Sequence, residues 1–438
     1  MSRFSRLTGL TAAAALTAVT AGRFVVARTE PWPPPTIAVT PNAGGLAARV
    51  SVADFSNVVV ERLRRFTKLP VRGSLDAGRD RLRAWDWTYL SRSAVLLYGR
   101  SHDARLIAAV LDGAANYEAD ARTHGAGDFG WYTQDIVNHT SFREIPITGL
   151  IIAPLVDLLA AARKDPELAA LLEPKRAWLT ELIGRGIAGL DKLYVEEDGR
   201  GYYLLPERNE IEPINLMSVY GAPLLGFGQL TGDGEAMREA AGLARTWKSV
   251  LKADAHGGLQ WPHTARPMAM KARPNPSESL LKGALAIEFP LAAYRAGLAL
   301  DHADIRMLAA APMTTLLGPV DDRHYLLRET IQANLDRFVT DEPSSRSLAL
   351  RPAAWFLYLC EDRRLTDFLD PYVFGIDPKF YLHDSVGMLA MARRLAAEHG
   401  PGACDVPPDQ TVQARAGSPA GALASSVAEI GTTRSTLR

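Results

Sequence analysis

The sequence predicts an all-α protein whose main domain is an (α/α)6 toroid, a ring of helical hairpins. Three observations support this prediction. Apolar residues recur at helical spacing from about residue 53 to residue 396. Short turns with glycine, proline or a capping aspartate separate the periodic stretches. No stretch alternates apolar and polar residues over several positions, so the sequence does not support a large β-sheet.

Several stretches illustrate the helical periodicity. Residues 58–66, 90–98 and 106–111 carry apolar side chains at helical spacing, and residues 150–159 form the clearest apolar stripe. Roughly a dozen such helices pair as hairpins, each followed by a longer loop with aromatic and charged residues. Because a hairpin can bury its apolar face only against its neighbours, about six of them are expected to close into a ring. The strict sequence repeat of a tetratricopeptide array is absent.

Capping residues mark where helices begin and end. Asp165 and Pro166 predict an N-cap followed by a proline at the first helical position. Gly232 and Asp233 predict the end of one helix and the cap of the next. Residues 202–205, Tyr-Tyr-Leu-Leu, are expected to form a short strand in a loop.

The N-terminal segment has the composition of a targeting sequence. Arg3 and Arg6 precede an apolar run at residues 7–22 that is rich in Ala and Thr. A basic start followed by a short apolar stretch is typical of a secretory signal peptide. Residues 1–27 are therefore interpreted as a cleaved signal or as an uncleaved membrane anchor, and the protein is expected to be secreted or held in the cell envelope. The Pro-rich residues 28–52 would then form a stiff linker.

The remaining boundaries follow from composition. The toroid is expected over residues 53–400. Residues 401–438 are expected to be a disordered tail, because they hold few aromatic side chains that could bury surface. Cys360 and Cys404 are the only cysteines of the chain. Export would permit a disulfide between them, but two cysteines are too few for a thiolate zinc site.

Charge and motifs exclude several classes of function. The 49 Lys and Arg residues balance the 49 Asp and Glu residues, so no excess positive charge favours nucleic acid. The 9 histidines show no pair at helical ligand spacing, and we therefore expect no metal. A nucleophile elbow, a phosphate loop and a dinucleotide fingerprint are all absent, so no cofactor is expected. The only expected membrane contact is through the N-terminal anchor.

Residues 128–144 combine aromatic and polar side chains just before an apolar helix. An aromatic face beside hydrogen-bonding groups suits a sugar ring, whose C–H face stacks while its hydroxyls are bound at the edge. The alternative is a loop that packs its own aromatic residues and caps the next helix with its glutamate. The candidate residues in this segment are Trp131, Tyr132, His139, Arg143 and Glu144.

Three later segments supply further candidates. Asn215 and Tyr220 open a Gly- and Leu-rich helix, where the inner helices of a toroid direct polar side chains to the central cavity. Trp261 and His263 lie on a tight loop that either forms one wall of a cleft or holds a buried tryptophan with a surface histidine. Glu278 either contacts substrate or only complements a helix dipole.

Parts of the chain resemble a known superfamily. Residues 215–233, which read NLMSVYGAPLLGFGQLTGD, and the loop 257–262, GGLQWP, resemble a helix and a turn of six-hairpin carbohydrate enzymes. Residues 277–298 resemble an inner helix of the same enzymes. This superfamily holds the helical domain of D-glucuronyl C5-epimerase, toroid polysaccharide lyases and six-hairpin glycosidases. The resemblance covers most of residues 80–396 in architecture, and it implies the toroid fold and a polysaccharide or oligosaccharide partner.

Two enzymatic hypotheses follow. A lyase or epimerase acting on a uronate-containing glycan removes the proton next to the carboxylate, so it needs a base and a cation. Tyr220 or His263 is the expected base, with His139 in the same set, and Arg143 is the expected carboxylate clamp. A glycoside hydrolase instead needs two carboxyl groups across the scissile bond. Its candidates are Asp128, Asp135, Glu144, Glu207 and Glu278.

The third hypothesis is a glycan-binding protein of the cell envelope without catalytic activity. A cleft lined by Trp131 and Trp261 would bind sugar by stacking alone. Loss of binding on substitution of these aromatic residues, with no turnover of any glycan, would distinguish this protein from both enzymes.

Overall fold

The structure is a computed structural model that describes part of the 438-residue chain. The described residues are 37–38, 51–67, 77–124, 129–134, 141–205, 210–253, 259–265, 278, 280–321, 324–327, 351–375 and 384–397. The chain divides into two units, Met1–Pro35 and Thr36–Arg438, and every described residue belongs to the second. The predicted signal segment 1–27, most of the linker 28–52 and the tail 401–438 lie outside the described residues.

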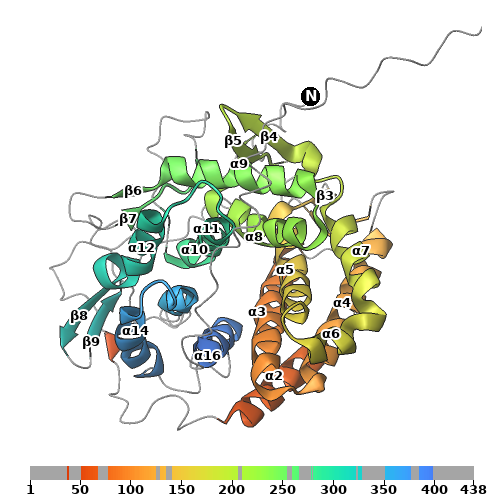
Figure 1. Cartoon of the computed structure of the whole chain (residues 1–438), viewed down its shortest axis with the longest axis horizontal. Coiled ribbons are helices and arrows are strands. Elements are labelled where there is room, and N and C mark those ends of the chain that lie inside the picture. Colours follow the sequence, from red (N-terminus) through yellow and green to blue (C-terminus); the bar gives the residue numbers. More distant parts are fainter. Residues whose placement is uncertain are drawn as a thin grey trace, which may run out of the picture. The chain divides into compact units, whose positions relative to one another are not determined.

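Helices of the second unit form an inner ring and an outer layer (Figure 1). The inner ring consists of α3 (Ala77–Ser101), α5 (Ile145–Ala162), α8 (Ile214–Thr231), α10 (Leu280–Ala286) with α11 (Glu288–Arg295), the 3-10 helix η5 (Arg351–Tyr358) and α16 (Ser385–Ala397). The outer layer consists of α2 (Val52–Thr67), α4 (Ala104–His124), α6 (Pro166–Leu172) with α7 (Arg176–Ile187), α9 (Gly234–Val250), α12 (His302–Ala311) and α14 (Arg364–Gly375). Inner and outer positions alternate along the chain.

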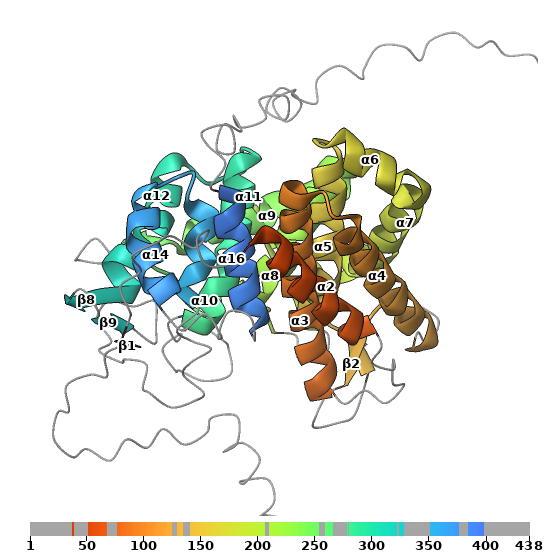
Figure 2. The same ribbon diagram turned by 90° about the horizontal axis from the view of Figure 1, so that it is seen from below.

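Contacts between the inner helices close the ring. α3 packs against α5, α5 packs against α8, and α8 packs against α10 and α11. η5 contacts α10 and α16, and α16 packs along α3, so the last described helix meets the first inner one (Figure 2). The Ser385 hydroxyl donates to Asp86 Oδ1 at 2.6 Å across this junction. The predicted (α/α)6 toroid is therefore confirmed.

Local sequence explains where several helices begin and end. The Asp165 side chain accepts hydrogen bonds from the first N–H groups of α6, and the Asp233 side chain does the same for α9. Gly232 ends α8 with a φ of +77°, a left-handed conformation that glycine adopts without steric penalty. These helix boundaries agree with the sequence-based predictions.

The most apolar described helix, α5, lies in the core of the ring. It is the one described helix long and apolar enough to cross a membrane, but 83% of that stretch is buried inside the protein. Its packing against α3 and α8 identifies it as a core helix. A Cβ atom at Gly149 of α5 would lie 2.7 Å from Tyr220 Cα of α8. Only a residue without a side chain allows these two backbones to approach so closely.

Short antiparallel strands occur in the loops between helices. β2 (Tyr132–Gln134) pairs with β3 (Ser141–Arg143), β4 (Tyr194–Glu197) with β5 (Arg200–Tyr203), and β6 (Lys252–Ala253) with β7 (Leu259–Gln260). β9 (His324–Leu327) pairs with both β1 (Ile37–Ala38) and β8 (Leu317–Asp321). The strand expected at residues 202–205 begins inside β5 and continues through a bridge between Leu204 and Ile211. The short turns η2 (Glu173–Lys175), η3 (Asp191–Leu193) and the π-helical η4 (Pro312–Leu316) complete the described elements.

Candidate functional site

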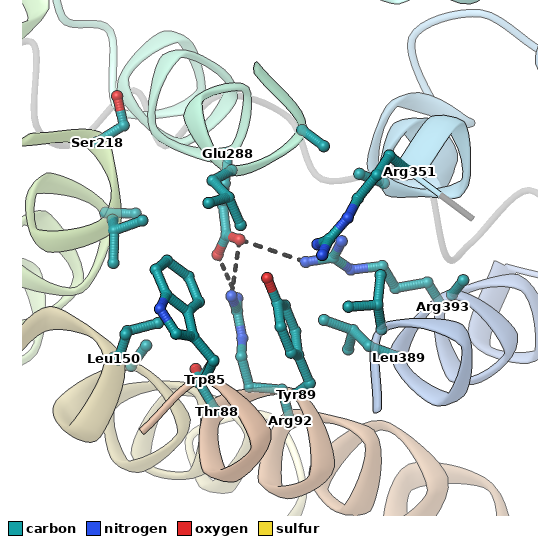
Figure 3. Close-up of a pocket in the computed structure, with 18 of the residues that line it drawn as sticks. Trp85, Thr88, Tyr89, Arg92, Leu150, Ser218, Glu288, Arg351, Leu389 and Arg393 are labelled. Carbon is teal, nitrogen blue, oxygen red and sulfur yellow. Dashed lines mark hydrogen bonds and ion pairs between the residues drawn. The ribbon is translucent and has the colours of Figure 1, made fainter. Parts of the chain in front are cut away.

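A cavity occupies the centre of the inner ring (Figure 3). Residues of α3, α5, α8, α10, α11, η5 and α16 line it, so every inner position contributes to its wall. Its free volume is about 50 Å³, which is enough for a few water molecules. The polar side chains that line it include Tyr89, Arg92, Ser218, Glu288, Arg351 and Arg393.

Arg92 is the centre of an ion-pair network in this cavity. Its Nε donates to Asp157 Oδ2 at 2.6 Å, and its Nη1 donates to Glu288 Oε2 at 2.7 Å. Nη2 also donates to Glu288 Oε1, so the Arg92 guanidinium binds that carboxylate in a bidentate manner. Arg393 Nη2 donates to Glu288 Oε2 at 3.3 Å. The network joins α3, α5, α11 and α16 across the ring.

Burial and neighbouring charges shift the pKa values of these groups. Burial alone would raise the pKa of Glu288, but Arg92 and Arg393 outweigh this effect and lower the pKa to about 2. Burial lowers the pKa of the Arg393 guanidinium to about 10, even though Glu288 lies beside it. Burial raises the pKa of Tyr89, and the adjacent Arg351 guanidinium offsets part of the rise. At neutral pH, Glu288 is therefore a carboxylate, Arg393 is a cation and Tyr89 is a phenol.

Among the described residues that line the cavity, arginines outnumber carboxylates. Arg92, Arg351 and Arg393 stand beside one carboxylate of this described lining, that of Glu288. Asp157 adds a second carboxylate next to Arg92, outside the lining, where 38% of its side chain stays exposed. Burial raises the pKa of Asp157, and Arg92 offsets part of that rise. A buried site with more guanidinium than carboxylate groups favours an anionic ligand.

A second polar cluster lies at the N-terminal ends of α8 and α10. His263 Nδ1 lies 3.2 Å from Glu278 Oε1, and His263 Nε2 lies 3.5 Å from Lys282 Nζ. Because an ammonium group can only donate, His263 Nε2 accepts and its Nδ1–H donates to Glu278. The His263 ring is therefore held in the tautomer that carries its lone pair on Nε2. The Glu278 side chain is fully buried at 0% exposure, and that of His263 is 16% exposed.

Backbone hydrogen bonds bring the surrounding segments together. The Glu278 N–H donates to the Trp261 carbonyl at 3.4 Å, and the first N–H of α8 donates to the His263 carbonyl at 2.9 Å. Glu212 and Asn215, at the start of α8, are 0% and 3% exposed. Asn215 Oδ1 and Trp261 Nε1 are buried and have no hydrogen-bond partner among the described residues. Polar atoms of this kind are the ones that a polar ligand would satisfy.

We refer to Glu212, Asn215, His263, Glu278 and Lys282 as the histidine cluster. One helical turn beyond Asn215 and Lys282, the side chains of α8 and α10 line the central cavity. The histidine cluster therefore stands next to the cavity, toward the N-terminal ends of two of its wall helices. Together they form the candidate site.

The structure brings four of the residues predicted from sequence together. Asn215, Trp261, His263 and Glu278 come from three separate segments and meet at the histidine cluster or directly beside it. Their spacing along the chain does not impose this meeting, which results from the parallel arrangement of the inner helices. The cluster thus combines a histidine, two carboxylates, an amide and an amine.

Tyr220 lies on the face of α8 that points away from the cavity. Its ring centroid is 5.2 Å from that of Tyr203, whose hydroxyl donates to Glu239 of α9. Ser218 and Val219 line the cavity instead, because successive residues of a helix point about 100° apart. Burial raises the pKa of Tyr220 far above its ordinary value, so the phenol stays protonated at neutral pH.

Trp131 and Arg143 contact the backbone of the fold itself. Trp131 is 2% exposed, and its Nε1 donates to the Tyr117 carbonyl at 2.8 Å. Arg143 is 7% exposed, and its guanidinium donates to the carbonyls of Gly186 and Ala188 at the end of α7, the latter at 2.6 Å. The Arg143 guanidinium, which is predicted from the sequence to bind a substrate carboxylate, thus donates to two backbone carbonyls instead.

The other candidates of this segment lie close by. Tyr132 is paired with Arg143 in the hairpin of β2 and β3. Glu144 is buried directly before α5. His139 lies outside the described residues, so its predicted role stays a prediction.

The cavity contains residues that the sequence-based analysis does not single out. Arg92 and Asp157 each stand inside an apolar helical stripe, residues 90–98 and 150–159, and a charge at such a position is a detectable signal. Arg351 and Arg393 do not interrupt an apolar stripe, so the sequence does not mark them. They meet in the cavity because η5 and α16 are neighbours in the ring.

No protein-family model and no curated protein sequence matches this chain. Two solved structures match it with a TM-score of 0.50 and 14% sequence identity, over 80% of this chain and 96% of theirs. One is the unsaturated glucuronyl hydrolase of Bacillus sp. GL1, described as responsible for the degradation of glycosaminoglycan. The other is a UGL variant with dGlcA-Glc-Rha-Glc. The likeness concerns the fold: this chain shares the (α/α)6 toroid of unsaturated glucuronyl hydrolase, as its resemblance to six-hairpin carbohydrate enzymes implies.

Proposed function

We propose that this chain is an enzyme that processes a uronate-containing saccharide at the site formed by the central cavity and the histidine cluster. The observation that carries this proposal is the excess of arginine over carboxylate among the described residues that line a cavity walled by the inner ring. A uronate presents a carboxylate that guanidinium groups bind well, and a ring face on which an indole such as that of Trp85 can stack. The shared fold with a hydrolase of unsaturated glucuronyl groups agrees with this substrate class.

Hydrolysis is the reaction that the site supports best. It requires one carboxyl group that protonates the leaving oxygen and a second that activates water or attacks the sugar. Glu212 and Glu278 are the candidates, because both are fully buried at 0% exposure on segments that backbone hydrogen bonds join. Both residues precede helices that wall the cavity. We place the glycosidic bond of a sugar whose acid group lies in the cavity on the side of these two carboxylates.

Proton abstraction is the second candidate reaction, and the tautomer of His263 favours it. With Nδ1–H donated to Glu278, the Nε2 lone pair can accept the proton from the carbon next to the uronate carboxylate once the substrate has displaced the Lys282 ammonium from it. Lys282 Nζ, 3.5 Å from Nε2, and the cavity arginines would neutralise the negative charge that develops on the carboxylate. Elimination follows if the bond to the leaving oxygen breaks, and C5-epimerisation follows if a proton returns from the opposite face.

A paired assay separates these reactions. The purified protein is incubated with an oligosaccharide that ends in unsaturated glucuronate, with saturated uronate polysaccharides and with neutral polysaccharides. Reducing ends and the ultraviolet absorbance of unsaturated uronate are followed together. New reducing ends without new absorbance indicate hydrolysis, and a gain of absorbance indicates elimination. Deuterium uptake from solvent without either signal indicates epimerisation. Preferential action on neutral glycans would contradict the proposal.

Amide variants then test the assigned carboxylates. Glu212→Gln and Glu278→Gln should each lower hydrolysis by roughly 10²- to 10⁴-fold, because a glutamine can neither give nor take the catalytic proton. Glu181→Gln, on a side chain of α7 that is 69% exposed, is the matched control and should act like wild type. Full hydrolysis by both amide variants would exclude these roles. Saccharide binding without any turnover would favour the non-catalytic envelope protein.

We also propose that the protein is exported through residues 1–27. Cys360 is disulfide-bonded, and the one other cysteine of the sequence, Cys404, lies outside the described residues. Disulfides persist in oxidising compartments, which supports export. Cell fractionation of the full chain and of a chain without residues 1–27, with N-terminal sequencing, separates a cleaved signal from an anchor. Recovery of the full chain in the cytosol would contradict export.

A further inference from the structure

Outside the candidate site, the outer helix α9 carries a buried carboxyl group, that of Glu239. Glu239 is 2% exposed, and its Oε2 accepts a hydrogen bond from the Tyr203 hydroxyl of β5. Its Oε1 has no hydrogen-bond partner among the described residues. Burial raises the pKa of Glu239, and the hydrogen bond from Tyr203 offsets part of the rise. Because burying a half-satisfied carboxyl group costs free energy that an apolar side chain would not, stability alone does not explain Glu239.

Tyr203 connects Glu239 to the histidine cluster. Its side chain reaches α9, against which β5 packs (Figure 1), and its backbone carbonyl accepts from the Glu212 N–H at 2.8 Å. The bridge between Leu204 and Ile211 continues this pairing toward the loop. Glu212 therefore lies opposite Tyr203 in the same antiparallel ladder, and the backbone position of Tyr203 sets that of Glu212.

We infer that Glu239 is a positioning residue, which fixes the candidate catalytic carboxylate of Glu212 through Tyr203. This inference rests on the proposed function, because it concerns how that site is held in place. The Tyr203 ring also packs against that of Tyr220, with centroids 5.2 Å apart, but hydrophobic attraction is non-directional. A hydrogen bond depends on distance and angle, so Glu239 fixes where the Tyr203 side chain meets α9. Catalytic groups must be held within about 0.5 Å of their working geometry, so this constraint matters for Glu212.

Thr246 provides a second contact between α9 and β5, which does not lead to Glu212. It lies about two helical turns beyond Glu239, and its hydroxyl donates to the Gly201 carbonyl at 2.6 Å. Gly201 is paired with Glu196 of β4. Both contacts hold β5 on α9, but only that of Glu239 acts on the residue that pairs with Glu212. Thr246→Val removes a buried hydrogen bond between the same two elements and is therefore the matched control.

Amide hydrogen exchange of the full-length protein, read at Glu212 by mass spectrometry with fragmentation, tests the inference alongside urea unfolding. Tyr203→Phe and Glu239→Leu should each raise the Glu212 exchange rate by roughly 10- to 100-fold beyond what their loss of global stability explains. Glu239→Gln keeps an oxygen that accepts from Tyr203 and should retain most of the protection. Thr246→Val should lower stability without this additional increase. The double variant Tyr203→Phe/Glu239→Leu removes both partners, so its stability should return toward that of wild type while Glu212 exchange stays raised.

Turnover is measured separately, as a split between kcat and KM. If the protein hydrolyses a saccharide, Tyr203→Phe should lower kcat by roughly 10- to 100-fold at a nearly unchanged KM, because Glu212 acts in the reaction step. Unchanged Glu212 exchange in both single variants, or a double variant that regains wild-type exchange together with its stability, would overturn the inference. Glu212 exchange as fast in Thr246→Val as in Tyr203→Phe, or a wild-type kcat in Tyr203→Phe, would overturn it as well. Raised exchange in a protein without any turnover keeps the positioning of Glu212 and refutes the proposed enzyme.

Discussion

Glu288→Gln tests whether the ionised carboxylate in the cavity stabilises the ring. The pKa of Glu288 falls from its ordinary value of 4.5 to about 2 in the folded protein. One pH unit corresponds to about 1.4 kcal/mol, so ionised Glu288 stabilises the fold by about 3 kcal/mol at neutral pH. Its side chain is only 26% exposed, so solvent screens little of this contribution. Glutamine keeps the shape of the side chain and removes the charge shared by Arg92 and Arg393.

The same pKa predicts how the effect depends on pH. Because the folded-state pKa lies below the unfolded-state pKa, the contribution of Glu288 is complete above about pH 5 and is lost as the pH falls toward 2. Glu288→Gln lacks this acid-dependent contribution. The unfolding free energies of wild type and variant should therefore differ by about 3 kcal/mol at neutral pH and converge in acid.

Urea unfolding followed by circular dichroism at several pH values measures this difference. Glu181→Gln, with its side chain 69% exposed, is the control and should change the unfolding free energy little at any pH. Stability of Glu288→Gln within about 0.5 kcal/mol of wild type at neutral pH would refute the reasoning, as would a difference that does not change with pH.

Three further substitutions test other contacts. Gly149→Val should lower the unfolding free energy by about 1–3 kcal/mol in thermal melts, because a Cβ there would lie 2.7 Å from the Tyr220 backbone. Gly234→Ala, where a Cβ meets nothing within 4 Å, should be neutral. Arg143→Met should lower stability by about 2–4 kcal/mol, because the Arg143 guanidinium binds two backbone carbonyls. The KM for the saccharide should stay unchanged. A raised KM at unchanged stability would instead support the predicted role of Arg143 in binding the substrate carboxylate. Cys360→Ser should lower stability by about 2–5 kcal/mol, the usual cost of removing a native disulfide. Equal urea unfolding of wild type with and without reductant would contradict this.

Much of the fold could be predicted because its signals are local. The apolar periodicity of residues 150–159 identifies α5, and Asp165 and Asp233 identify helix starts that their side chains do cap. Such signals connect residues a few positions apart, so they can be recognised without tertiary structure. The ring then follows because hairpins of this kind can bury their apolar faces only against one another.

The charged cavity could not be predicted because its contacts join distant residues. Arg92 pairs with one carboxylate 65 positions away and with another 196 positions away. Arg393 contacts Glu288 across 105 positions. No spacing rule connects such partners, and an arginine on an amphipathic helix is ordinarily assigned to the surface. His263 and Glu278 are only 15 positions apart and lie near loop and cap signals, so the sequence does identify them as candidates.

The rotation of α8 about its own axis explains why Tyr220 faces away from the cavity. The sequence places Tyr220 on an inner helix, but a rotation of one residue decides whether a side chain meets the cavity or the outer layer. Both faces of α8 are buried, so apolar patterning does not distinguish them. The aromatic contact between Tyr203 of β5 and Tyr220 of α8 arises only in the folded chain, where β5 packs against α9.

Because α16 closes the ring against α3, the cavity is complete only after α16 has been synthesised. α16 supplies one wall and Arg393, and it is the last described helix of the chain. While the ribosome is still making the segment before residue 385, the nascent chain has an open ring whose apolar faces chaperones and proteases can reach. The proposed binding of a saccharide in this cavity therefore requires that residues 385–397 have been synthesised. A chain that ends before residue 385 would lack one wall of the cavity and Arg393.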